Sequence, residues 1–116
     1  GAVGVLGVNT ERPGGLTLAL RAIDHFAARG LGTVLHNQPL GIASAAQVHL
    51  GAARADVLGH AMELFGHVML EDDLIVEPLD YAGGRVRVPD GPGLGVALDE
   101  EALDRYATAA PVVLAR

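Results

Sequence analysis

The sequence contains no cysteine and no lysine. Without cysteine the chain forms no disulfide, presents no thiolate nucleophile and builds no zinc site of the cysteine type, and cysteine usage leaves its compartment undetermined. Without lysine it has neither a lysine general base nor a Schiff-base nucleophile. All eight basic residues are arginine. Thiol and Schiff-base chemistry are therefore excluded for this chain.

An excess of positive charge and a long apolar run are missing as well. The net charge of -6 at pH 7 argues against a nucleic-acid partner, because phosphate binding needs concentrated lysine and arginine. The longest apolar runs fall well short of the ~20 residues that a membrane-spanning helix needs. No basic segment precedes an apolar one at residues 1–4, so no signal peptide is predicted. We expect a cytoplasmic protein that binds neither nucleic acid nor membrane.

What the sequence does contain is apolar residues, which make up 50% of its 116 positions. That content suits one globular unit of ordinary domain size. The chain begins without Met, directly inside an apolar run. We therefore expect its first residues to belong to an element whose earlier part is missing.

The first two thirds alternate short apolar runs with stretches of helical periodicity. Residues 2–8 form an apolar run with glycine, which is typical of a strand buried on both faces. Apolar residues recur at helical spacing from Leu16 to Ala27, and Gly30 is placed to end that helix. A second strand is predicted at 31–35.

The same order repeats after the second strand. Residues 41–53 are predicted to form a second helix, with Ser44 as its cap and small side chains that suit close packing on a sheet. Residues 60–64 are a candidate for a third, short strand. Strands that alternate with helices through short loops are typical of parallel α/β units. The sequence therefore predicts an α/β fold.

The last third has a different pattern. Residues 74–78 and 85–88 flank Tyr81-Ala82-Gly83-Gly84, which indicates a hairpin, and residues 89–95 form a rigid loop rich in proline and glycine. A short helix and a final strand are predicted to follow. Asp99 caps that helix, Leu103 and Tyr106 lie on its buried side, and the strand spans 112–114.

Polar side chains stand at the ends of the three predicted strands. Asn9 follows the first, His36 the second, where Asn37 and Gln38 extend the polar run, and Glu63 lies at the third. Parallel α/β barrels place reactive groups at these carboxyl ends. Histidine acts as a base near neutral pH, a carboxylate orients a substrate or acts as an acid, and an amide fixes the imidazole tautomer or contacts substrate.

A simpler interpretation of the same residues stays open. His36 then only ends its strand, and Glu63 belongs to a surface ion pair. The other polar groups point less clearly to chemistry. His25 and His49 fall on predicted helices as packing or surface residues, and the acidic run at 71–73 is more typical of a solvated turn than of a cation site.

Several short motifs follow one another in the order of a single family. They stand at 14–17, at His36, and at 40–46, 62–66, 71–74 and 88–96, of which the last, Val-Pro-Asp-Gly-Pro-Gly-Leu-Gly-Val, is the most specific. With these motifs the sequence resembles the C-terminal part of the mandelate racemase and muconate lactonizing enzyme family, in the enolase superfamily. The resemblance covers nearly the whole chain.

The resemblance implies a particular fold. The family combines an α+β capping domain with a modified TIM barrel, here taken as (β/α)7β. The three predicted strands would be its sixth, seventh and eighth. Residues 1–73 would then be a partial barrel, and residues 74–116 would be the hairpin, loop and helix that return toward a missing capping domain.

The resemblance also implies a reaction. Family members bind Mg²⁺ or Mn²⁺ through three carboxylates on the third, fourth and fifth strands, which would precede Gly1, and the metal stabilises an enediolate made by removing a proton α to a carboxylate. His36 matches the base on the seventh strand, and Glu63 matches the glutamate that hydrogen-bonds the substrate carboxylate or enediolate. The expected substrate is a small carboxylate.

Asn9 departs from the family pattern. The family places a lysine base or an aspartate paired with the histidine at that position, and an amide cannot stabilise imidazolium as a carboxylate does. Glu11 is a weaker candidate for the carboxylate that the family pairs with the histidine.

The branch of the family stays open. His36 favours racemase or acid-sugar dehydratase chemistry, whereas residues 62–66 and 72–73 resemble the muconate cycloisomerases. The alternative is a catalytically incomplete barrel that serves as a structural or assembly piece, pairing with another copy or with the missing barrel half.

Overall fold

The structure, a computed structural model, describes residues 2–36, 40–112 and 114. Asn37 and Gln38, which were predicted to extend the polar run after His36, lie outside the described residues. No helix among the described residues has the length and hydrophobicity to cross a membrane. The elements in chain order are β1 (Val5–Val8), α1 (Leu16–Ala27), β2 (Gly32–Leu35), α2 (Gly41–Ala53), the 3₁₀ turn η1 (Gly66–Val68), β3 (Tyr81–Ala82), β4 (Arg85–Val86) and α3 (Glu100–Tyr106).

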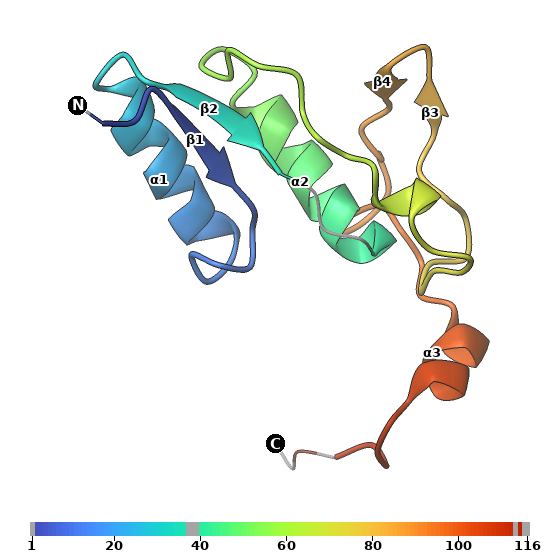
Figure 1. The fold of residues 1–116 in the computed structure, drawn as a ribbon. Coiled ribbons are helices and arrows are strands. Elements are labelled where there is room, and N and C mark those ends of the chain that lie inside the picture. The colour runs from blue at the N-terminus through green and yellow to red at the C-terminus, as the bar shows by residue number, and fades with distance from the viewer. Residues whose placement is uncertain (1, 37–39, 113, 115–116) are drawn as a thin grey trace.

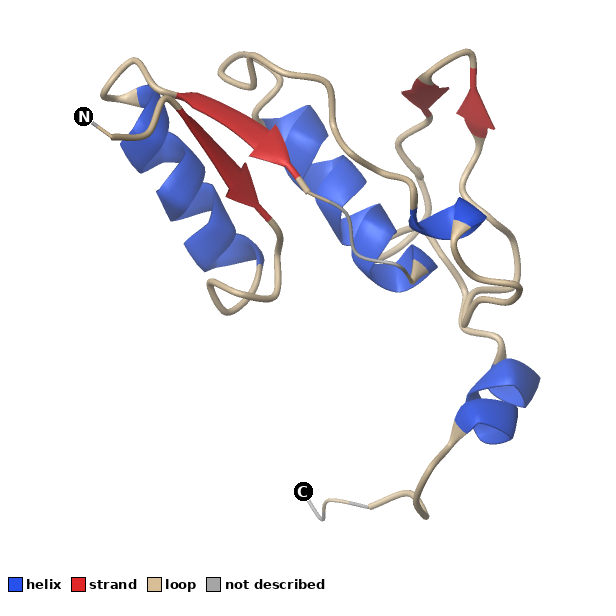
Figure 2. Ribbon diagram, viewed as in Figure 1, coloured by secondary structure: helices blue, strands red, loops and turns tan. Residues whose placement is uncertain are grey.

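The first half of the chain is a parallel α/β unit, as the sequence predicted (Figures 1 and 2). β1 and β2 pair in parallel, with Val5 opposite Gly32 and Val8 opposite Leu35. Both helices pack on the same face of this pair and share one apolar core. That core consists of the buried residues Val8, Ala19, Ile23, Leu35 and Leu50.

The sheet is less buried and shorter than predicted. Residues 2–4 are not part of β1, and Val5 is 43% exposed, so the prediction of a strand buried on both faces is wrong for this chain. Val8 and Leu35 point toward the helices. Because side chains alternate between the two faces along a strand, the residues next to them in β1 and β2 are directed to the opposite face. On that face Val5 is exposed, whereas Val34 is half-buried.

The predicted third strand is reduced to a single bridge. Glu63 pairs in parallel with His36, and its N–H donates to the Leu35 carbonyl at 2.9 Å. The direction and the position are therefore those predicted for residues 60–64. A longer ladder does not form among the described residues, since neighbouring residues of this segment make no further bridge to β2.

The start of α2 is capped from a distant part of the chain. The Gly41 N–H donates to both carboxylate oxygens of Asp73, at 2.9 and 2.8 Å, and Asp73 also accepts from Leu74 N–H at 2.7 Å. The prediction of Ser44 as the cap is wrong, because Ser44 lies buried inside the helix and no side chain of its own first turn caps α2. A carboxylate at this end also complements the helix dipole.

The predicted hairpin is present with a different first arm. β3 and β4 pair antiparallel around Gly83 and Gly84, whose φ angles of 55° and 73° suit a two-residue turn of type I′. A two-residue turn makes its immediate neighbours the arms, so Tyr81 pairs with Val86 and residues 74–78 are excluded from the hairpin. Ile75 pairs with Leu98 instead. The division of the chain at residues 73 and 74 stays a prediction.

For the last part of the chain, from α3 onward, one prediction is confirmed and two are wrong. Asp99 caps it by accepting from Ala102 N–H at 2.9 Å. Leu103 and Tyr106, however, are exposed rather than buried, because most of α3 extends beyond the apolar clusters of the chain (Figure 1). The described residues 112 and 114 are not in a strand, and Val113 lies outside the described residues. The radius of gyration is 15.8 Å, against roughly 13 Å for a compact chain of this size.

An ion pair links α1 to the end of α2. Arg54 donates from Nε to Asp24 Oδ1 at 2.7 Å and from Nη2 to Oδ2 at 3.3 Å. The hydrogen bond from the Arg54 guanidinium lowers the pKa of the Asp24 carboxyl below its ordinary value. A carboxyl whose pKa is lowered on folding stabilises the fold above its unfolded pKa, and this contribution is lost as the pH falls through the lowered value.

Replacing Asp24 by Asn is therefore expected to lower the free energy of unfolding slightly at neutral pH. The loss is small because the pair is exposed and screened by solvent. The difference between the two proteins should shrink as the pH falls below about 3.9, the pKa of an unfolded aspartate. Urea unfolding of both proteins across this range measures it, with Asp104→Asn on α3 as the control. A difference that does not change with pH would contradict the assignment.

Candidate active site

The structure brings the three predicted site residues to one edge of the sheet. Val8 lies opposite Leu35, so the next residues along β1 and β2, Asn9 and His36, stand at the same level. His36 in turn pairs with Glu63. Asn9, His36 and Glu63 therefore follow three neighbouring parallel segments at their carboxyl ends. Alternation from Leu35, which faces the helices, directs the His36 side chain to the opposite face.

His36 and Glu63 are in direct contact. Nδ1 of His36 lies 2.7 Å from Oε2 of Glu63, and the two side chains are 47% and 51% exposed. When Nδ1–H donates to the carboxylate, the neutral ring keeps its lone pair on Nε2. The pair therefore holds the ring in one tautomer and leaves Nε2 as the proton acceptor. The simpler interpretation, a surface ion pair, describes the same contact without a substrate.

Phe65 lies beside the His36–Glu63 pair, although it was not among the predicted site residues. Its ring meets the His36 imidazole edge-on, with the centroids 6.3 Å apart and an interplanar angle of 66°. Phe65 stands two residues after Glu63, and period-two alternation in an extended segment would have placed it on the same face. An aromatic edge beside the imidazole restricts the positions that the ring adopts.

Asn9 is buried and takes part in a local turn. Its Oδ1 accepts a hydrogen bond from Arg12 N–H at 3.0 Å, which closes the chain after β1. The side-chain oxygen of Asn9 thus organises the loop that leads to α1. The carboxylate that contacts the imidazole comes from Glu63 on the other side of β2.

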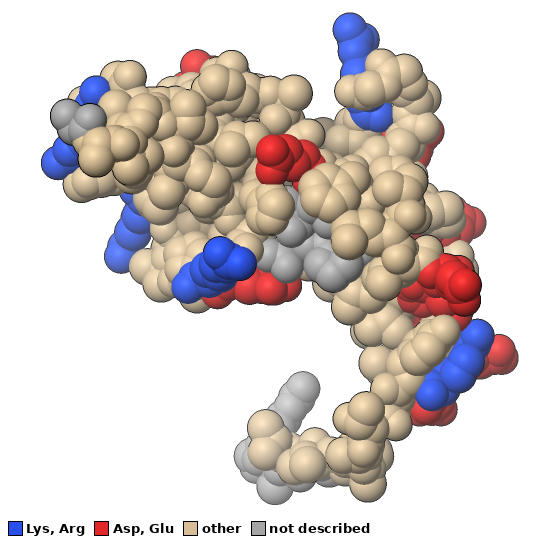
Figure 3. Space-filling model, viewed as in Figure 1, with Lys and Arg blue, Asp and Glu red and all other residues tan. Residues whose placement is uncertain are grey.

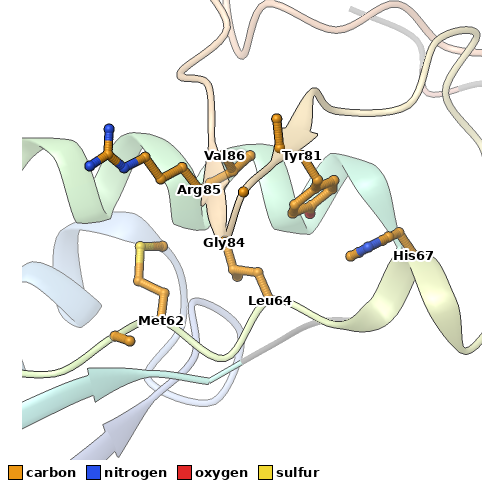
Figure 4. Close-up of a pocket in the computed structure, with 10 residues that line it drawn as sticks. Met62, Leu64, His67, Tyr81, Gly84, Arg85 and Val86 are labelled. Atoms are coloured by element: carbon orange, nitrogen blue, oxygen red, sulfur yellow. The ribbon is translucent and has the colours of Figure 1, made fainter.

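A cavity among the described residues lies on another face. It has a volume of about 670 Å³, and its lining includes Met62 and Leu64 together with the hairpin (Figure 4). These two residues flank Glu63 in the sequence, so alternation turns them away from the side that carries Glu63. At its rim the rings of His67 and Tyr81 stack with centroids 3.9 Å apart, and burial raises the pKa of the Tyr81 hydroxyl. The cavity is thus separate from the His36–Glu63 pair.

The remaining polar groups of interest have structural contacts. His49 Nε2 lies 3.1 Å from the Leu94 carbonyl, and the ring of His25 lies against Arg29 on the surface. In the acidic turn, Asp73 caps α2, while Asp72 accepts from both Arg105 and Tyr106. Backbone and Tyr106 hydrogen bonds lower the pKa of Asp72. The turn therefore connects elements rather than collecting a cation.

The described residues do not supply a complete metal site. No group of three or more histidine, aspartate or glutamate side chains among them is placed to hold an ion. The His36–Glu63 pair offers a single carboxylate, whereas Mg²⁺ prefers an octahedral shell of oxygen ligands. The residues present here do not by themselves fit a magnesium centre.

Charged side chains are unevenly distributed over the molecule. In Figure 3 acidic side chains gather toward the α3 end, and basic ones lie mainly over the α1 and hairpin ends.

Comparison with known proteins points to one family. A family model described as "Enolase C-terminal domain-like" matches residues 1–102. Muconate cycloisomerase 1-1 of Acinetobacter lwoffii is 39% identical over 106 residues, which cover 88% of this chain and 27% of that protein. The chain therefore spans about a quarter of the length of this relative.

Solved structures show the same relationship. The 2-chloromuconate cycloisomerase of Rhodococcus opacus 1CP superposes with a TM-score of 0.83 at 33% identity, over 93% of this chain and 29% of that one. An enolase from Thermobispora bispora DSM 43833, complexed with magnesium and formate, superposes with a TM-score of 0.79 at 36% identity, over 88% of this chain and 24% of that one. The fold of this chain thus corresponds to the C-terminal region of α/β enzymes of the TIM-barrel type.

Proposed function

Because the chain belongs to the mandelate racemase and muconate lactonizing enzyme family of the enolase superfamily, we propose that it forms the C-terminal portion of an enzyme that removes a proton α to a carboxylate. The observation that carries the proposal is the contact between His36 Nδ1 and Glu63 Oε2 at 2.7 Å. In this proposal β1, β2 and the segment at Glu63 are the sixth, seventh and eighth strands of a (β/α)7β barrel.

His36 is the base in the proposed step. Its Nε2 lone pair takes the α-proton, the Cα–H bond breaks, and the electron pair moves onto the carboxylate group of the substrate to give an enediolate. The ring becomes imidazolium, and its Nδ1–H remains on Glu63. Because Oε2 of Glu63 accepts this hydrogen bond, it stabilises the imidazolium as it forms. Return of the proton to Cα, or loss of a leaving group from the enediolate, completes an isomerase or a lyase reaction.

Glu63 has two oxygens with separate roles in this proposal. Oε2 holds the imidazole, and the family resemblance assigns the other oxygen, Oε1, a hydrogen bond to the substrate carboxylate or enediolate. An ionised carboxylate only accepts hydrogen bonds, so contact with an anionic enediolate requires a proton on Glu63. Asn9 supports the edge of the site through its turn to Arg12. The substrate class is a small carboxylate.

The metal belongs to the proposal for the longer protein only. The family resemblance assigns Mg²⁺ or Mn²⁺ to carboxylates of three other strands, and the solved enolase relative carries magnesium. When bound, such an ion stabilises negative charge on the enediolate oxygens. Cytoplasmic location and the lack of nucleic-acid and membrane partners stay predictions.

A second candidate function rests on the open sheet. β1 has no partner strand on its outer edge among the described residues, and Val5 is exposed on the sheet face away from the helices. Open edges and apolar faces favour pairing with another chain. On this candidate the chain is a structural or assembly piece that pairs with a second copy or with the remaining barrel strands, and has no activity of its own.

Solvent deuterium exchange tests the proposed function. The full-length protein that carries this chain is expected to wash deuterium into the α position of small carboxylic acids in D₂O with Mg²⁺, and to lose this exchange with EDTA and regain it with added metal. NMR of the acids measures the rate. No exchange into any of a panel of muconolactone-like, acid-sugar and N-acylamino acids would contradict the proposal.

The same assay decides between the two candidates. The 116-residue chain is assayed alone, with Mg²⁺, beside the full-length protein. Turnover by the chain alone would rule out the assembly role. Light scattering is measured on the same sample, and a stable monomer would count against pairing with a second copy.

A further inference from the structure

Gln47 is a polar side chain in an unusually buried place. It lies on α2, its exposed fraction is 0%, and it is among the largest fully buried side chains of the molecule. Its Nε2 donates a hydrogen bond to the backbone carbonyl of His36, eleven residues earlier in the chain. Its Oε1 is buried and has no hydrogen-bond partner among the described residues.

The bond from Gln47 to the His36 carbonyl explains why a glutamine is found there. An amide oxygen buried without a partner is unfavourable, and an apolar side chain of similar size would fill the same volume without that cost. What glutamine adds to this position is the donor to the His36 carbonyl. The function of the side chain is therefore to be sought at His36.

The bond from Gln47 completes the support of His36. The His36 N–H donates to the Val8 carbonyl at 2.8 Å, which ties the residue to β1. The His36 carbonyl is tied to α2 by Gln47. The imidazole is tied to Glu63. Three different segments thus hold the backbone N–H, the carbonyl and the side chain of one residue.

We propose that Gln47 is a positioning residue, which fixes the backbone of His36 so that the imidazole meets Glu63 with Nε2 free. The consequence for activity rests on the proposed function, whereas the geometry of the His36–Glu63 pair does not. Without the bond, the His36 carbonyl is released from α2, and the ring is no longer held against the carboxylate. Small displacements of a reacting group have large effects on rate.

The test uses Gln47→Met in the full-length protein, since Met keeps the size and flexibility of the side chain and removes the donor. The control is Val48→Ala, the next residue of α2, which is buried at 3% exposure in a different apolar cluster and has no hydrogen bond to His36. The Nδ1 and Nε2 signals of the His36 ring are followed by ¹⁵N NMR and assigned by their loss in His36→Gln. They report the tautomer directly, and a merely structural variant does not shift them.

Gln47→Met is expected to move the His36 ring signals toward a mixture of tautomers, while Val48→Ala leaves them in place. The α-proton exchange rate should fall roughly tenfold to a hundredfold with little change in KM. Unchanged ring signals in a folded Gln47→Met protein would overturn the proposal, and so would an equal shift in Val48→Ala. If the wild-type protein catalyses no exchange, the proposed function fails while the ring signals still decide the role of Gln47.

If the Gln47→Met protein does not fold, a measurement on the wild-type protein still tests the proposal. The side-chain amide protons of Gln47 are expected to exchange with solvent at least tenfold more slowly than those of an exposed glutamine, because one of them is bonded to the His36 carbonyl in the interior. Exchange at the rate of an exposed amide would overturn the proposal.

Discussion

Replacing His36 by Gln is expected to lower the rate of α-proton exchange by about 10²- to 10⁴-fold, the usual contribution of a positioned general base. Glutamine is close to histidine in size and its amide still bonds to Glu63, but it offers no basic lone pair at neutral pH. Since the change removes proton transfer rather than substrate binding, kcat should fall and KM should change little. Deuterium exchange and steady-state kinetics measure the two effects.

The control for this variant is His25→Gln. His25 is exposed on α1, where its Nδ1 lies 3.1 Å from Arg29 Nη1, and it has no contact with Glu63. Exchange by the control should equal that of the wild-type protein. If His36→Gln retained wild-type exchange, His36 would not be the base, and the contact with Glu63 would be an ordinary surface ion pair.

Replacing Ile23 by Ala is expected to lower the free energy of unfolding by about 2–5 kcal/mol. Ile23 lies on α1 with no exposed surface, in the core that joins α1 to β1, β2 and α2. The loss combines the transfer free energy of the missing methyl and methylene groups with a cavity that the surrounding elements fill only in part. Urea unfolding followed by circular dichroism measures the change.

Leu18→Ala is the matched control on the same helix. Leu18 is 42% exposed, so the truncation removes apolar contacts only in part and leaves no enclosed cavity. It should cost less than about 1 kcal/mol, as surface substitutions usually do. Equal losses for the two variants would mean that the core between α1 and the strands is not packed as the structure has it.

The local pattern of the sequence was sufficient for the two helices of the first half. Helical spacing of apolar residues between Pro13 and Gly30 gave bounds for α1 that agree with the structure. The capping of α3 by Asp99 was predicted correctly for the same reason, since the donor, Ala102 N–H, is three residues away. Both depend on interactions within one turn or one element.

Predictions that required knowledge of distant neighbours were the ones that failed. The cap of α2 comes from Asp73 rather than Ser44, and the two bonded residues are 32 positions apart. The exposure of Leu103 and Tyr106 depends on whether another element covers α3, which their spacing does not report. Residues 60–64 have strand-like composition, but the length of their ladder depends on how far the segment follows β2.

The candidate site shows the same difference between local patterns and contacts of distant residues. The sequence by itself determined that Asn9, His36 and Glu63 stand where apolar runs end, because the change from apolar to polar residues is a local property of the chain. Only the tertiary structure decided that Glu63 bonds His36, that Asn9 closes a turn to Arg12, and that the amide of Gln47 reaches the His36 carbonyl. These contacts follow from the register of parallel segments and from the packing of α2 on them, and both are set by burial of the whole core rather than by any local pattern.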